Sequence, residues 1–357
     1  TGDWATDASS LPIGLTDLAA VAMDNRIFVV GGYTESGIYS RHIYSATVRD
    51  INGTLSDWTW IGDMPEGLAG HQVVLHETTA QTSTLLVLGG VSESSVPNSS
   101  ATTFRAVIDN ATGGLVGPVV SGPPLEQPVH YHSSVLWGDY AYVIGGNKLE
   151  PYMDETYDTA YVAQVSEYGE LGSFAEMSAT LPYPVRSAAG VLYTSPTTQT
   201  IFIMGGTESD ASSTSSTPTV GVLIGDINPE TGWVDSWRRS SAGDLVVPVW
   251  GHAGVIANGG NLFVLGGRAG NLSNPVISST VKSALVADDD PARIYNWCGQ
   301  EPCERWQGQQ GDLLLGARSG AAAVVASGHI FVMGGVDELH ETAQDTVFRG
   351  GVGGVGD

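Results

Sequence analysis

A short apolar segment that ends in two glycines occurs six times in this chain of 357 residues. The first copy is Ile27-Phe28-Val29-Val30-Gly31-Gly32, and the first glycines of the six copies are residues 31, 89, 145, 205, 266 and 334. A period of about 60 residues that fills a chain indicates a repeat architecture. Four apolar residues before a turn signal predict a strand buried on both faces. The chain therefore has six similar units, each built around one buried strand.

The first repeat predicts four antiparallel strands. Residues 18–23 and 27–32 form the first two strands, with Asp24-Asn25 as the turn between them, and residues 43–48 form the third. Asn52-Gly53 is a strong hairpin signal and leads into a fourth strand around Trp58. No helical periodicity occurs in the chain. Four antiparallel strands per unit are typical of a propeller blade, so we expect an all-β, six-bladed β-propeller.

The two ends of the chain predict how the ring closes. The sixth unit has a third strand at residues 345–348, followed only by a glycine-rich tail, so its fourth strand is missing. Near the other end, Gly2-Asp3-Trp4-Ala5-Thr6 resembles the segment around Trp58. We expect residues 1–12 to complete the last blade, which removes an open sheet edge. Residues 1–349 then form one domain, and residues 350–357 form a tail or linker.

These features resemble the kelch repeat over essentially the whole chain. The shared features are the double glycine, a turn with proline, and an aromatic residue on the fourth strand. The aromatic residues are Trp4, Trp58, Phe174, Trp237 and Trp306. The resemblance implies a six-bladed propeller like those of the galactose-oxidase-like and sialate-epimerase-like groups. This chain has longer loops, and few of its units keep an arginine before the first strand. The resemblance does not imply the chemistry of those groups.

The charge of the chain limits its partners. The net charge is -24, and Lys148 and Lys282 are the only lysines. Such a field repels nucleic acids and anionic membrane surfaces, and it favours cationic partners or a saline exterior. No run of 18 apolar residues exists that could cross a bilayer. We therefore expect no nucleic-acid partner and no direct membrane insertion.

The two cysteines, Cys298 and Cys303, predict a small disulfide in a hairpin. No histidine or third cysteine stands nearby to complete a zinc site. A disulfide implies an oxidising compartment, so we expect an extracellular or cell-surface protein whose signal peptide has been removed. Two inert thiols in a cytosolic adaptor are the alternative interpretation.

Four sequons predict glycosylation of exposed turns. They lie at Asn52, Asn98, Asn110 and Asn271, each followed two residues later by Ser or Thr. The alternative is that these segments are simply polar surface loops.

Residues that open the first strand of each unit are expected at the mouth of the central channel. The candidates for binding there are His71, His130, His132, Arg186, Trp250, His252 and Arg318. A metal site needs three or more ligands about 2 Å from one ion. His71 and His252 belong to opposite units, so we predict no metal site. The histidines then serve packing and hydrogen bonding, or they form a polar pocket.

No catalytic constellation emerges from the sequence. Copper-radical chemistry needs a tyrosine crosslinked to a cysteine, but both cysteines are expected in the local disulfide. The sialidase-type boxes and phosphate-binding loops are absent. We therefore predict no catalytic residues and no cofactor. The leading hypothesis is a non-catalytic binding, assembly or adhesion module that contacts other surface proteins, copies of itself or glycans. The alternative is an extracellular carbohydrate-active enzyme, sialate-epimerase-like or oxidase-like, with its site at the channel mouth.

Overall fold

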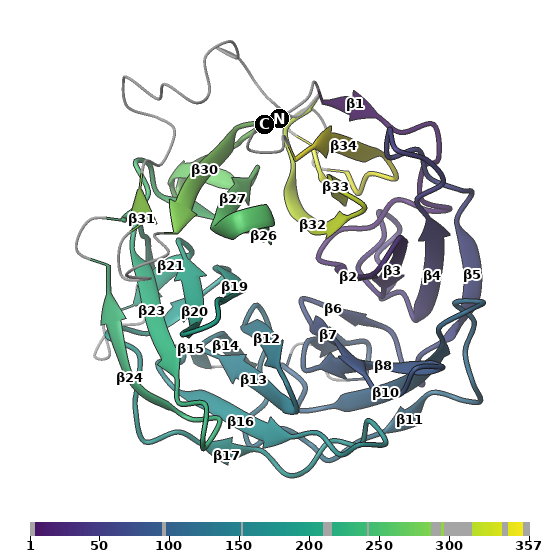
Figure 1. Cartoon of the computed structure of the whole chain (residues 1–357). Helices are drawn as coiled ribbons and strands as arrows, with labels where there is room; N and C mark the ends of the chain where they lie inside the picture. Colours follow the sequence, from purple (N-terminus) through teal and green to yellow (C-terminus); the bar gives the residue numbers. More distant parts are fainter. Residues whose placement is uncertain are drawn as a thin grey trace.

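The computed structural model describes residues 4–94, 98–150, 153–209, 216–240, 243–286, 294–295, 316–337 and 342–352. Within these ranges the regular structure is β-strand apart from one short 3₁₀ turn, η1 (Asn258–Gly260). The described residues form six four-stranded antiparallel sheets, which stand around a common centre (Figure 1). Each sheet corresponds to one of the six sequence repeats.

The strands run in order from the centre of the molecule to its rim in five of the sheets. The first sheet contains β2 (Ala19–Met23), β3 (Arg26–Val30), β4 (His42–Thr47) and β5 (Thr59–Asp63). The second contains β7 (Gln72–Glu77), β8 (Thr82–Leu88), β10 (Thr103–Asp109) and β11 (Val120–Ser121). The third contains β12 (Ser133–Trp137), β13 (Tyr140–Ile144), β16 (Ala160–Gln164) and β17 (Ala175–Glu176). The fourth contains β19 (Ala189–Thr194), β20 (Gln199–Met204), β23 (Val222–Ile227) and β24 (Val234–Arg239). The fifth contains β26 (Ala253–Ala257), β27 (Asn261–Leu265), β30 (Val281–Val286) and β31 (Ile294–Tyr295).

The sixth sheet joins the two ends of the chain. Its strands are β32 (Ser319–Ala326), β33 (His329–Val336), β34 (Val347–Gly351) and the N-terminal β1 (Ala5–Thr6). Ala5 pairs with Arg349, and the Trp4 ring packs with Ile330 and Phe348. Strand β34 extends to Gly351 and Val352 is buried, so the last sheet continues past the expected domain boundary at residue 349.

The double glycines allow each sheet to bind the next one. The N–H of the second glycine donates to a carbonyl in the following unit, as Gly90 does to Val129 at 2.7 Å. The first glycine makes room for that carbonyl, because a Cβ at Gly89 would lie 2.5 Å from the Val129 oxygen. The same bond occurs at all six repeats, including Gly335 to Leu15 at 2.8 Å, which joins the sixth unit to the first.

Replacing Gly89 by alanine is therefore expected to destabilise the protein strongly. Gly89 and Gly138 both have a left-handed φ, of 62° and 52°. Both substitutions incur the backbone cost of about 1–2 kcal/mol, but a Cβ at Gly138 meets nothing within 4 Å. We expect more than about 4 kcal/mol of destabilisation for Gly89→Ala and about 1 kcal/mol for Gly138→Ala by urea unfolding. Equal effects of the two substitutions would contradict this explanation of the glycine pairs.

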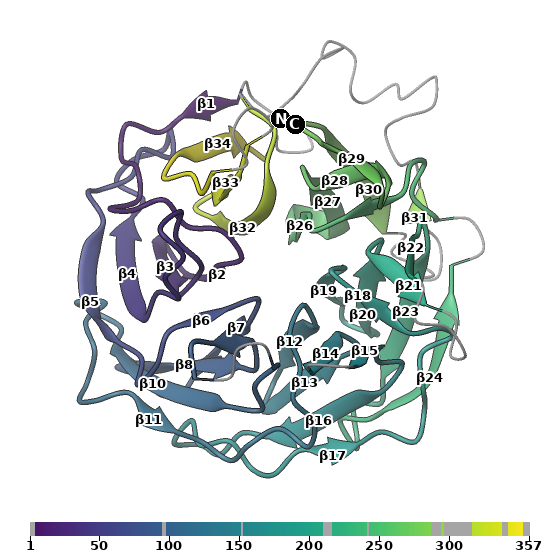
Figure 2. The same ribbon diagram turned by 180° about the vertical axis from the view of Figure 1, so that it is seen from behind.

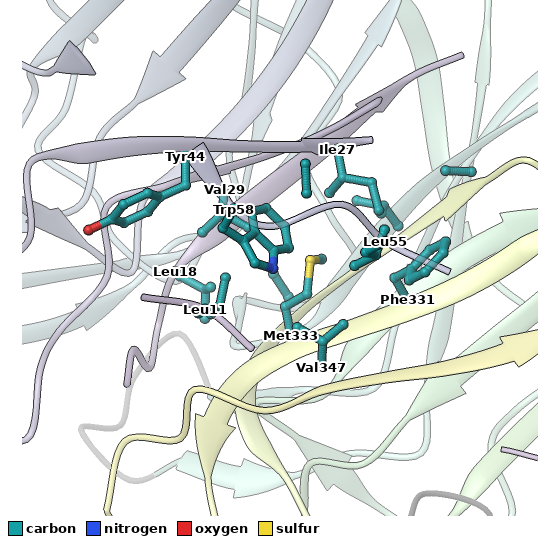
Figure 3. Packing of buried hydrophobic residues seen from close by; sticks show 14 of the residues in the cluster. Leu11, Leu18, Ile27, Val29, Tyr44, Leu55, Trp58, Phe331, Met333 and Val347 are labelled. Carbon is teal, nitrogen blue, oxygen red and sulfur yellow. The ribbon is translucent and has the colours of Figure 1, made fainter. Parts of the chain in front are cut away.

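The hydrophobic core lies between neighbouring sheets. Between the last and first units, Phe331 and Met333 pack against Ile27, Val29 and the buried indole of Trp58 (Figure 3). The predicted aromatic positions Trp4, Phe174 and Trp237 are buried in the same way, whereas Trp306 lies outside the described residues. Each inner strand also contacts the inner strand of the next sheet, and β32 contacts β2.

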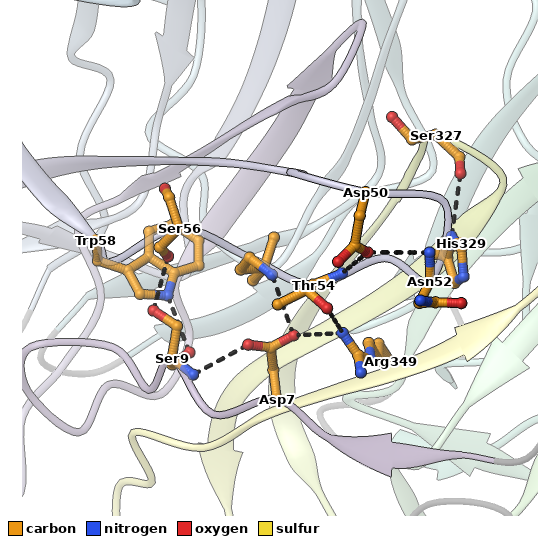
Figure 4. A network of polar contacts seen from close by, with 11 residues as sticks. Asp7, Ser9, Asp50, Asn52, Thr54, Ser56, Trp58, Ser327, His329 and Arg349 are labelled. Carbon is orange, nitrogen blue, oxygen red and sulfur yellow. Dashed lines mark hydrogen bonds and ion pairs between the residues drawn. The ribbon is translucent and has the colours of Figure 1, made fainter.

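A buried carboxylate holds the N-terminal segment against both of its neighbours. Asp7 Oδ2 accepts hydrogen bonds from Arg349 at 3.1 Å and from the Leu55 amide at 3.3 Å (Figure 4). The same arginine nitrogen donates to Thr54 Oγ1 at 3.0 Å. The Ser9 hydroxyl donates to the Ser56 carbonyl at 2.7 Å. These contacts connect the first unit, the last unit and the segment between β1 and β2.

Smaller sheets extend one end of the ring, on the face seen in Figure 2. They are formed by β6 (Leu68–Ala69) with β9 (Val91–Ser92), and by β14 (Asn147–Glu150) with β15 (Met153–Thr156). One three-stranded sheet contains β18 (Val185–Arg186), β21 (Thr207–Ser209) and β22 (Ser216–Pro218). A second contains β25 (Val249–Trp250), β28 (Arg268–Asn271) and β29 (Asn274–Ile277). They surround the candidate site.

Candidate functional site

Six residues, one before the first strand of each unit, form a closed cycle of backbone hydrogen bonds. Each N–H donates to the carbonyl of the corresponding residue in the preceding unit, at 2.8 to 3.0 Å. The Asp17 amide donates to Gly320, which connects the first unit to the sixth. All six residues have a left-handed φ between 51° and 67°. We call this cycle the annulus; its members are Asp17, Gly70, Tyr131, Ser187, Gly251 and Gly320.

A cavity of about 500 Å³ lies over the annulus. This volume is within the range that is usual for small-molecule sites. Six of the seven residues predicted at the channel mouth line it, namely His71, His130, His132, Arg186, Trp250 and His252. The sequence did not single out Asp17, Tyr131, Asn147, Asp154 and Arg268, which line it as well.

Arg318 is the exception among the predicted residues. It occupies the position that Val129, Val185 and Val249 hold in other units, where the backbone carbonyl binds the double glycine of the preceding unit. Its side chain is buried, with the guanidinium 4.8 Å from the centre of the Phe348 ring and an N–H donating to Thr346 Oγ1 at 2.6 Å. Arg318 therefore contributes to packing within the sixth unit.

The side chains of His71, His132 and His252 pack between glycines of two neighbouring units. A Cβ at Gly31 would lie 2.6 Å from Cε1 of His71, and one at Gly90 would lie 2.8 Å from its Cβ. His132 and His252 have equivalent contacts, and smaller or apolar residues hold this position elsewhere. In the described part of the chain, the nitrogens of the three rings have no hydrogen-bond partner of good geometry. The three rings therefore make the packing contacts that the first interpretation expects, but in the described part of the chain they lack the hydrogen bonds that it also expects.

Burial keeps these imidazoles neutral. It lowers the pKa of His71 to about 4, against a smaller opposing effect of the Val30 backbone, and it lowers the pKa of His132 and of His252 to about 3. No three His, Cys, Asp or Glu side chains within the described ranges are placed to hold a metal ion.

One wall of the cavity carries an ordered polar group. Arg186 Nη1 donates to Asp154 Oδ1 at 2.6 Å. Burial raises the pKa of Asp154, but the hydrogen bond and charge of Arg186 outweigh it and leave that pKa below its usual value. His130 Nδ1 donates to the Asn147 carbonyl at 2.9 Å and contacts Ser99 Oγ at 2.8 Å. Burial lowers the pKa of His130 to about 4, so this ring is also neutral.

Asp17 and Tyr131 face each other across the annulus. The Tyr131 ring lies over Gly70, since a Cβ there would be 3.1 Å from Tyr131 Cε1, and the tyrosine side chain hydrogen-bonds to the Asp17 carboxyl. Burial raises the pKa of Asp17 to about 6, against the opposing effects of Tyr131 and Arg268. Asp17 in turn raises the pKa of Tyr131. A comparison of the repeats could have found both residues, because they occupy a position where three units have glycine.

The remaining predicted sites lie apart from the cavity. Cys298 and Cys303 fall outside the described residues. Asn52 is exposed in a turn and Asn271 is the exposed last residue of β28, whereas the Asn110 amide donates to the carbonyls of Thr79 and Ala80. Asn98 is half-buried. In the part of the chain that the structure describes, no helix is long and apolar enough to cross a membrane.

Comparison with solved structures shows that the chain has the fold of a β-propeller. One such structure is that of YjhT, a β-propeller that aligns with a TM-score of 0.66 over 95% of this chain and 95% of its own. The identity is 12%, so the likeness concerns the fold alone. No protein-family model matches the chain, and no curated protein matches it.

Proposed function

We propose that this chain is a six-bladed, kelch-like propeller, closed by β1, that binds a neutral saccharide at its mouth without transforming it. The observation that carries the proposal is the set of charges in one cavity. Two carboxylates, of Asp17 and Asp154, and two guanidinium groups, of Arg186 and Arg268, line it. The whole chain has only 14 Lys and Arg residues and a net charge of -24. A balanced cavity in so acidic a protein suits a neutral ligand that both donates and accepts hydrogen bonds.

Saccharide chemistry matches this lining. Each hydroxyl both donates and accepts, so it can bind a carboxylate or a guanidinium group. Tyr131 and Trp250 provide apolar surface beside the polar groups, which is the usual composition of a small-molecule site. The neutral histidines and the paired Asp154 suit binding rather than proton transfer.

The proposal predicts saturable binding of neutral sugars. We expect methyl glycosides of glucose, galactose, mannose or N-acetylglucosamine at millimolar concentration to change tryptophan fluorescence, because Trp250 lines the cavity. Arg186→Met should weaken binding about tenfold or more, since it removes a charged hydrogen-bond donor. Arg238→Met is the control, because Arg238 pairs with Asp226 outside the cavity. The absence of binding by every glycoside would contradict the proposal.

An enzyme remains the second candidate because of one observation. A carboxyl group with a pKa of about 6, as burial gives to Asp17, can exchange protons near neutral pH. Conversion of a bound glycoside, lost in Asp17→Asn, would favour this candidate.

An exterior location completes the proposal, with other surface proteins, copies of the chain or glycans as partners. The acidic charge, the cysteine pair and the sequons support it. Intact masses measured with and without reductant test it, and two free thiols in native protein would contradict it.

A further inference from the structure

The floor of the cavity has a covered half and an open half. The Tyr131 ring extends over Gly70 towards Asp17, so these two side chains cover the part of the annulus that belongs to the first three units. The other half is formed by Ser187, Gly251 and Gly320. Gly251 is less covered than Gly320, because a Cβ there would approach a single side-chain atom, Ser319 Oγ at 3.0 Å, and one backbone nitrogen at 4.0 Å.

Different chemical groups border the open half on its two sides. At Gly320 a Cβ would lie 2.5 Å from Thr16 Oγ1 and 2.9 Å from Asp17 Oδ1, so this glycine allows the hydroxyl and the carboxylate to lie directly beside the backbone of the floor. On the other side, Arg186 immediately precedes Ser187 in the chain, and both line the cavity. Trp250 pairs with Arg268 in the small sheet above Gly251. A sugar ring lying on this floor would therefore meet the Asp17 carboxylate as an acceptor at one edge and the Arg186 and Arg268 guanidinium groups as donors at the other.

We propose that the open half of the floor is a saccharide subsite in which the Asp17 carboxylate, oriented by Tyr131, accepts hydrogen bonds from two adjacent hydroxyls of a sugar ring. This inference rests on the proposed function and specifies the part of the ligand that is recognised. A carboxylate has two oxygens and can accept from two neighbouring hydroxyls at once. Glycine lets the sugar approach the backbone closely. The left-handed φ of 51° at Tyr131, which is strained for a bulky residue, fits such a role.

The proton on Asp17 gives this subsite a pH dependence. Tyr131 and Arg268 lower the pKa of Asp17, against the larger effect of burial. The Asp17 charge in turn adds to the effects of burial and Tyr33 that raise the pKa of Tyr39. Burial raises the Asp17 pKa to about 6, so the carboxylate needed to accept both hydroxyls is present above that pH and is lost below it. Affinity should therefore be constant above pH 6 and fall up to about tenfold per pH unit below it.

Four variants test the subsite with the same panel of methyl glycosides and their singly deoxygenated analogues. Asp17→Asn should weaken binding about tenfold to a hundredfold and remove its pH dependence, because it removes a charged acceptor. Tyr131→Phe should weaken binding several-fold. Gly251→Asn should abolish binding, since asparagine tolerates the left-handed φ of 58° and fills the floor. Gly259→Asn is the control, because Gly259 has φ of 68° and open space around it, outside the cavity lining.

The outcomes separate this inference from the function on which it rests. Failure of the wild-type protein to bind any glycoside contradicts the proposed function. Wild-type affinity in Asp17→Asn, or any remaining binding in Gly251→Asn, overturns the subsite while leaving saccharide binding intact. The expected weakening in Asp17→Asn and loss in Gly251→Asn, with unchanged urea midpoints and weaker wild-type binding of the analogues that lack either of two adjacent hydroxyls, support it.

Discussion

Acidification to about pH 4 is expected to unfold the protein, because four buried imidazoles must gain protons. Burial lowers the pKa of His71 and His130 to about 4 and that of His132 and His252 to about 3. An unfolded histidine has a pKa near 6.5, so between these values the unfolded chain binds more protons than the folded one. The stability is complete above pH 6.5 and is lost as the pH falls towards the folded values.

The expected size of this effect is comparable to the whole stability of a domain. Each histidine contributes roughly 1 kcal/mol per pH unit, so four of them remove on the order of 10 kcal/mol between pH 6.5 and 4.5. Typical domains have about 5–15 kcal/mol. Asp17 acts in the opposite direction, because its raised pKa favours the folded state below pH 6, but it is a single group.

Leucine substitutions provide the matched control for the pH effect. In the first unit, Leu18 packs between glycines at the position that His71, His132 and His252 hold in their own units. A triple His→Leu variant at these positions should fold and should lose most of the slope of unfolding free energy against pH. Urea unfolding followed by tryptophan fluorescence from pH 7.5 to 4.5 measures this slope. A triple variant with the wild-type slope would show that the histidines are not its cause.

Removal of residues 1–10 is expected to abolish stable folding. The deletion takes Trp4 out of the core between the fifth and sixth units, and it leaves Arg349 without Asp7 and β34 without its outer partner. Loss of a buried tryptophan costs about 3–5 kcal/mol, and removal of Asp7 from the partly exposed Arg349 adds to this cost. The exposed edge of β34 would also favour aggregation, because its unpaired backbone groups can pair with another chain. Soluble expression and urea unfolding measure the result.

A milder substitution keeps this prediction measurable when the deletion does not fold. Asp7→Asn should lower the free energy of unfolding by about 2–3 kcal/mol, because it weakens the bonds to Arg349 and the Leu55 amide. Asp57→Asn is the control, since Asp57 is exposed nearby. Similar midpoints for both variants would mean that the N-terminal segment contributes little.

The sequence predicted the sheets well because each carries a local signal. Four apolar residues before Gly31-Gly32 predict β3, and Asn52-Gly53 predicts the hairpin before β5. The pairing of Trp4's segment with β34 followed from counting the strands in each repeat. The reason for the double glycine was not available, since it depends on a carbonyl in the next unit, such as that of Val129 beside Gly89.

The candidate site was predicted only in part because it is assembled from all six units. The histidines attracted attention by their residue type, yet His71, His132 and His252 lie packed between glycines. Asp17 and Tyr131 gave no such signal, because their chemistry depends on burial and on meeting across the annulus. Arg318 was predicted at the mouth because it comes just before the first strand of its unit. It stands two residues before Gly320, and at that position its side chain packs on Phe348 instead of reaching the cavity.

Amide hydrogen exchange at the annulus tests the ring most directly. The N–H groups of Asp17, Gly70, Tyr131, Ser187, Gly251 and Gly320 form one closed cycle. In a closed ring no member of the cycle can open alone, so we predict that all six exchange with the free energy of global unfolding. Much faster exchange at Asp17, whose N–H donates to Gly320 and so joins the first unit to the last, would contradict closure and with it the cavity that the annulus supports.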